Sequence, residues 1–213
     1  MTERRHVVLL GDSIFDNAAY VGGGPDVVAQ LRAVLPPGAR ATLCAVDGAT
    51  TAGLSSQVAR VPADATHLIV SIGGNDALHN IDLLSLRAGS SDEVLRTFAR
   101  RLAGFEEAYQ AALAPVLALR RPVTVCTIYN GALDAETAEI ARVALALFND
   151  VIIRIAVDRR LTVIELRSVC ADRSDYANPI EPSVSGGAKI AAAIARAVVG
   201  GDAGGGPSRI WGG

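Results

Sequence analysis

Short apolar runs alternate with longer amphipathic segments along this chain. The short runs are rich in Val, Ile, Leu or Thr and have the length of strands; they are residues 6–10, 41–46, 67–72, 123–128 and 162–166. The longer segments have helical composition; they are residues 26–35, 51–60, 91–119, 135–157 and 183–199. Pro36, Pro37 and Gly38 mark the end of the first helix, and Ser183 or Ser185 could cap the last one.

Regular alternation of strands and helices predicts an α/β protein. Right-handed βαβ units give a three-layer α/β/α fold, with a five-stranded parallel sheet covered by helices on both faces. We expect a flavodoxin-like strand order, 2-1-3-4-5. At 213 residues the chain is long enough for one domain, expected at residues 1–199, followed by a flexible glycine-rich tail at 200–213.

Composition narrows the possible partners. The net charge is −2 and the arginines are scattered, so we expect no nucleic-acid partner. The apolar run near the N-terminus is too short for a signal peptide, and no stretch has the length of a membrane span, which predicts a cytoplasmic protein without a membrane partner. Cys44, Cys126 and Cys170 are odd in number and lack metal-ligand spacing, so we expect buried thiols and neither a metal nor a disulfide.

The candidate chemistry lies directly after the first three predicted strands. These positions hold Gly11-Asp12-Ser13, then Gly48, then Gly73-Gly74-Asn75-Asp76. Each block alone is typical of a helix cap or a turn. Because the carboxyl ends of parallel strands share one edge of the sheet, where ligands bind, the fold would bring the three blocks together.

Taken in order, these blocks resemble the SGNH (GDSL-type) hydrolase family over nearly the whole chain. The resemblance implies that Ser13 is the nucleophile, exposed at a strand-to-loop junction, and that Asp12 stabilises its loop. It also implies that the Gly48 N–H, the Asn75 amide and the Ser13 N–H hold an oxyanion. Acyl transfer needs such donors beside a nucleophile and a base, and it needs no cofactor in this family.

One family block departs from its pattern. Where the family carries Asp-x-x-His before a proline, this chain has Asn178-Pro179-Ile180-Glu181 before Pro182. Glu181 therefore stands at the position of the catalytic histidine, and Asn178 at that of the aspartate. A carboxylate can act as general base, although its unperturbed pKa of about 4.3 makes it a weak one unless burial raises that pKa. We expect the Asn178 amide to donate a hydrogen bond to this carboxylate.

Three hypotheses follow from that departure. The first is a serine hydrolase that acts on a small ester or thioester, with Ser13 as nucleophile and Glu181 as base. The second is a non-catalytic protein that binds a small acyl ligand in the same pocket. In the third, His79 is a substitute base or a substrate-binding residue, because it follows Asn75 by four residues on the same loop. Residues 16–26 and 79–90 are expected to shape the pocket.

Overall fold

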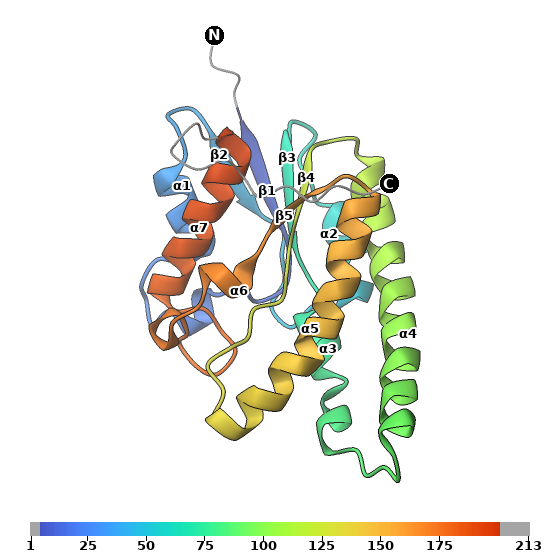
Figure 1. Cartoon of the computed structure of the whole chain (residues 1–213). Coiled ribbons are helices and arrows are strands. Elements are labelled where there is room, and N and C mark those ends of the chain that lie inside the picture. Colours follow the sequence, from blue (N-terminus) through green and yellow to red (C-terminus); the bar gives the residue numbers. More distant parts are fainter. Residues whose placement is uncertain (1–4, 201–213) are drawn as a thin grey trace.

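The computed structural model describes residues 5–200 and contains one parallel sheet of five strands (Figure 1). The strands are β1 (His6–Gly11), β2 (Arg40–Leu43), β3 (His67–Ser71), β4 (Val123–Cys126) and β5 (Thr162–Ile164). Their order is β2-β1-β3-β4-β5, and each neighbouring pair is parallel. The α/β fold and strand order predicted from the sequence are therefore confirmed. The predicted flexible tail lies outside the described residues, apart from Gly200.

Helices connect the strands and cover both faces of the sheet (Figure 1). The α-helices are α1 (Val27–Val34), α2 (Leu54–Val58), α3 (Gly74–Leu78), α4 (Ser91–Ala118), α5 (Ala135–Asp158), α6 (Leu166–Val169) and α7 (Val184–Val199). The 3-10 helices are η1 (Ala18–Tyr20), η2 (Thr51–Gly53), η3 (Ile81–Ser85) and η4 (Arg173–Asp175). Ser183 caps α7 as predicted, since its side chain accepts a hydrogen bond from the Gly186 N–H. The short helices α3 and α6 were not predicted.

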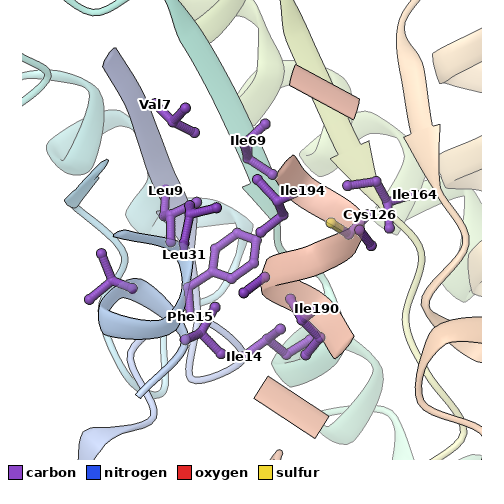
Figure 2. Close-up of a cluster of buried hydrophobic side chains, with 14 of the residues drawn as sticks. Val7, Leu9, Ile14, Phe15, Leu31, Ile69, Cys126, Ile164, Ile190 and Ile194 are labelled. Carbon is purple, nitrogen blue, oxygen red and sulfur yellow. The ribbon is translucent and has the colours of Figure 1, made fainter. Parts of the chain in front are cut away.

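Alternation along the strands divides the core in two. On β1, Val7 and Leu9 face one side of the sheet, while Val8 and Leu10 face the other, as the two-residue period of a strand requires. The first cluster packs against α1 and α7, and Figure 2 shows Phe15 surrounded by side chains from β1, α1 and α7. The second cluster packs against α2, α4 and α5. Both faces of the sheet are thus buried, which explains why the strands are almost continuously apolar.

The two longest helices reach past the sheet. α4 has 28 residues and α5 has 24, against six in the longest strand. At about 1.5 Å per helical residue and about 3.3 Å per strand residue, each helix is well over one and a half times as long as that strand. Figure 1 shows their N-terminal halves, together with η3, extending beyond the carboxyl edge of the sheet. These segments can therefore form side walls for a site at the carboxyl edge of the sheet.

Two expectations about composition can be compared with the structure. Cys44, Cys126 and Cys170 are free and buried, as predicted. Within residues 5–200, none of the helices combines the length and apolar character that crossing a bilayer requires.

Candidate active site

A tight turn at the end of β1 presents Ser13. Gly11 has φ +135°, and a Cβ there would lie 1.7 Å from the carbonyl oxygen of Ser71, so only glycine fits. This close approach lets the Asp12 N–H donate to that same oxygen at 3.1 Å. The side chain of Phe15 is fully buried in the first core cluster, which holds the turn from its other end (Figure 2). Contrary to the sequence expectation, Ser13 is only 8 % exposed, because the turn folds it into the protein.

The segment that carries Glu181 is fixed by hydrogen bonds from several elements. Tyr129 donates its hydroxyl to the Ile180 carbonyl oxygen at 2.5 Å, and Asn17 donates to the Pro182 carbonyl oxygen at 3.2 Å. The Ala177 N–H donates to the Glu181 carbonyl oxygen at 2.8 Å. Glu181 itself is 6 % exposed. A buried carboxylate is thus held in one place by its backbone.

Asn178 orients Glu181 differently from the sequence expectation. The Oδ1 atom of Asn178 accepts the backbone N–H groups of Ile180 and Glu181, each at 2.9 Å. Among the described residues, the buried Oε2 atom of Glu181 has no hydrogen-bond partner, so the expected donation from Asn178 to that oxygen is absent. Asn178 is exposed and positions Glu181 through the main chain, because its side chain folds back on the turn that it begins.

The electrostatic environment of Glu181 suits a base. The pKa of the Glu181 carboxyl is raised to about 6, mainly by burial. The hydrogen bond from the Ser13 hydroxyl lowers this pKa, and the nearby charge of Asp47 raises it. The interaction with Ser13 brings the serine proton and the carboxylate together. A carboxylate with a pKa near neutrality can accept that proton far more readily than an ordinary glutamate.

The donors expected at the oxyanion are only partly assembled. Asn75 lines the same cavity as Ser13 and Glu181, and its Nδ2 atom donates to the Ala49 carbonyl oxygen at 2.9 Å. An amide nitrogen has two N–H groups, so one stays available for a ligand. Gly48 is exposed with φ +75° and is not among the residues that line the cavity. The bond from Asn75 to Ala49 nevertheless keeps the Gly48 loop beside the site.

Asp12 is a second buried carboxylate in this cavity. It is 2 % exposed and its Oδ1 atom accepts the Ile14 N–H at 3.2 Å. Burial raises its pKa to about 7, and repulsion from Glu181 and Asp76 adds to the rise, against the lowering effect of the Ile14 hydrogen bond. Asp12 and Glu181 therefore resist being charged together, and Asp12 is the one that more readily keeps its proton.

The raised pKa of Asp12 predicts a pH-dependent stability. The unfolded chain loses this proton near 3.8 and the folded protein near 7, so the stabilisation is complete below the first value and is lost as pH rises through the second. The full loss is on the order of 4 kcal/mol. Asp12→Asn keeps an acceptor for Ile14 without the charge, and should make the protein more stable than wild type at about pH 8 in urea unfolding. Equal pH dependence in the two proteins would contradict the raised pKa.

A largely apolar cavity of about 150 Å³ opens beside Ser13. Its polar lining includes Asp12, Ser13, Asn75 and Glu181, and its apolar lining comes mainly from α3, η3 and α5. His79 is exposed and does not line the cavity, although its neighbours Leu78 and Asn80 do. Within residues 5–200, no group of three or more His, Cys, Asp or Glu side chains could hold a metal ion.

Two buried amide side chains that sequence reasoning missed hold the strand ends beside the site. Gln57 donates to the Gly11 carbonyl oxygen and accepts the Gly11 N–H, both at 2.7 Å. Asn149 does the same for Ile128, at 2.8 and 2.7 Å. Where a strand ends, its backbone loses its ladder partners, and these amides replace them. The available signal was a lone amide on the buried face of each helix.

Solved structures of known proteins share the fold of this chain. The chain resembles an extracellular lipase from Streptomyces rimosus, with a TM-score of 0.66 and 19 % identity over 89 % of this chain and 98 % of that one. It also resembles a lipase/acylhydrolase from Enterococcus faecalis (TM-score 0.66, 19 % identity, 92 % and 96 % of the two chains) and an aryl esterase from M. smegmatis (TM-score 0.64, 13 % identity, 92 % and 99 %). Such low identities show the shared fold alone.

Family membership rests on the sequence itself. Among curated proteins, none matches the chain significantly. The model of the GDSL-like lipase/acylhydrolase family, however, matches residues 9–186, which run from β1 through Ser13 to the beginning of α7 and include Glu181. The chain therefore belongs to the GDSL-like lipase/acylhydrolase family.

Proposed function

We propose that this protein hydrolyses a small carboxylic ester or thioester through an acyl-Ser13 intermediate, with Glu181 as the general base. The observation that carries the proposal is the pairing of Ser13 with a buried carboxylate at a largely apolar cavity. A nucleophile, a base with a pKa of about 6 and an amide donor thus line the same cavity, which is the set of groups that acyl transfer needs.

Each proton in the proposed reaction has a defined position. Glu181 takes the proton of the Ser13 hydroxyl as the serine oxygen bonds to the carbonyl carbon, and the carbonyl oxygen becomes an oxyanion. Asn75 donates its second N–H to that oxyanion, with the Ser13 and Gly48 N–H groups as the other candidate donors. Glu181 then returns the proton to the leaving alcohol or thiol as its bond to carbon breaks. Water, activated by Glu181, repeats both steps and releases the acid.

The substitution of glutamate for histidine is consistent with the uncharged side chain at position 178. A histidine base becomes an imidazolium, which needs an aspartate to stabilise its charge. Glu181 becomes neutral when it accepts the serine proton, so no second carboxylate is required. An aspartate at that position would repel the Glu181 carboxylate, whereas Asn178 holds the backbone without adding a charge.

A fluorophosphonate probe tests this proposal directly, because it labels serines that are activated as nucleophiles. The native protein should be labelled, and labelling should disappear in Ser13→Ala and after denaturation. The matched control is Ser55→Ala, which removes an exposed hydroxyl on α2 and should label as wild type. Labelling that persists in Ser13→Ala would identify another nucleophile and overturn the assignment.

Two observations favour the alternative, a non-catalytic binding protein. Among the described residues, none of those that line the cavity is a histidine, and Oε2 of Glu181 has no partner. A binding protein would satisfy that oxygen with a donor group of its ligand. In that case the native protein would resist the probe and would bind an ester without cleaving it.

A further inference from the structure

We infer that one face of α5 selects the acyl group: the cavity takes an uncharged apolar acyl chain of about six carbons, and Ala144 limits its length. This inference rests on the proposed function and names its substrate class.

The α5 face that borders the cavity is a helical stripe. Its members recur at intervals of three, four and one along the helix, which places them on one side; they are Thr137, Ala141, Ala144, Leu145 and Phe148. Across from this stripe, η3 contributes Ile81, Leu83 and Leu84. Ser13 and Glu181 form the polar end. An ester carbonyl at Ser13 therefore places its acyl chain between α5 and η3.

Burial distinguishes the closed end of the cavity from its opening. Leu83, Ile128 and Phe148 are buried, which marks the closed end. Leu78 and Ile81 are exposed, which marks the opening. Ala144 is partly buried, and a larger side chain there would project into the space along which the chain runs.

The volume of the cavity sets the size of the group. An apolar protein cavity of about 150 Å³ admits benzene, a six-carbon molecule. Pockets for larger ligands begin at about 300 Å³. The methylenes of a longer chain would have to pass the exposed Leu78 and Ile81 and remain largely in water, so they would add little to binding.

The lining also excludes a charged acyl group. No described residue that lines the cavity is a lysine, arginine or histidine, while Asp12 and Glu181 both are carboxylates. A second carboxylate on the acyl group would be desolvated beside the Glu181 carboxylate, and beside Asp12 wherever that group is ionised, without a counter-ion. The half-esters of dicarboxylic acids should therefore be poor substrates.

Aryl esters of acetate, butyrate, hexanoate, octanoate and decanoate test the inference. In wild type, kcat/KM should rise about fourfold per methylene, which corresponds to about 0.8 kcal/mol of burial, and stop rising at hexanoate. Ala144→Leu should move this limit to butyrate, because the larger side chain fills part of the space that the acyl chain needs. Leu145→Ala should extend the limit toward octanoate.

The matched control is Ala146→Leu, the same substitution at an exposed position of α5 that does not line the cavity. Its chain-length profile should equal that of wild type. A wild-type profile that keeps rising to decanoate, or equal profiles for Ala144→Leu and Ala146→Leu, would overturn the inference.

A binding measurement separates failure of this inference from failure of the proposed function. Hexanamide is neutral and resists hydrolysis, so it should raise the Tm of wild type and of Ala146→Leu but not of Ala144→Leu. If no ester is cleaved while hexanamide still shows this selectivity, the proposed function is wrong and the site for a six-carbon group stands. No stabilisation by hexanamide in wild type would contradict the site itself.

Discussion

Ser13→Ala is expected to abolish the hydrolysis of a short-chain aryl ester, with a loss in kcat on the order of 10³-fold or more. The reason is that Ser13 supplies the hydroxyl that interacts with Glu181. Among the described residues that line the cavity, no other hydroxyl does so. The measurement is steady-state release of the aryl alcohol by purified wild-type and variant protein.

The fold should survive this change. Ser13 is buried, but alanine removes only a hydroxyl that interacts with Glu181, so the free energy of unfolding should change by no more than about 1 kcal/mol. Urea unfolding of both proteins provides the control. An active Ser13→Ala protein would show that the nucleophile lies elsewhere, whereas an unfolded one would leave the fluorophosphonate experiment on native protein as the deciding test.

The fold was predictable because each strand carries a clear apolar run, and the helices between the strands fix the connections. The ends of strands were harder to predict. The run at residues 41–46 continues past the end of β2 at Leu43, because Cys44 and Ala45 are buried in the loop that follows. A hydrophobic run indicates burial rather than strand geometry, and the first two residues of the loop after β2 are as buried as the strand itself.

The residues of the candidate site could be predicted only where a sequence motif indicated them. Ser13, Asn75 and Glu181 line one cavity, as their motifs implied, whereas Gly48 lies outside it. The contacts of Asn178 depend on a backbone turn whose geometry no residue pattern specifies.

The amide of Gln57 pairs with Gly11 across 46 positions, and a lone amide on a buried helix face does not indicate which backbone group it will contact. The wall that α5 contributes to the cavity could not be predicted for a similar reason. An apolar stripe such as that on α5 is expected to pack against the core, and only the three-dimensional structure shows that part of it faces empty space.

The pH dependence of catalysis should distinguish a glutamate base from a histidine base. A general base works only when deprotonated, so kcat/KM should rise with pH through the pKa of Glu181, which burial raises to about 6. At about pH 5.5, a carboxylate with that pKa is still roughly a quarter ionised, whereas a free imidazole is roughly one tenth deprotonated. Wild type should therefore keep more activity at this pH than an enzyme that relies on histidine.

Two substitutions at position 181 test the assignment. Glu181→Gln keeps the shape of the side chain but cannot take a proton, so kcat should fall by about 10²-fold or more and the acidic limb should disappear. Glu181→His should move the limb upward, at a low rate, because Asn178 cannot stabilise an imidazolium as an aspartate would. The measurement is kcat/KM against pH for wild type and both variants.

The control for this series is His79→Ala, since His79 is exposed and does not line the cavity. It should retain both the rate and the profile of wild type. If instead His79→Ala lost as much activity as Ser13→Ala, the imidazole would be the base, because members of one catalytic unit give similar losses when removed. An unchanged pH profile in Glu181→Gln would exclude Glu181 as the general base, whatever the result for His79→Ala. The Glu181 carboxylate would then have no part in moving the serine proton.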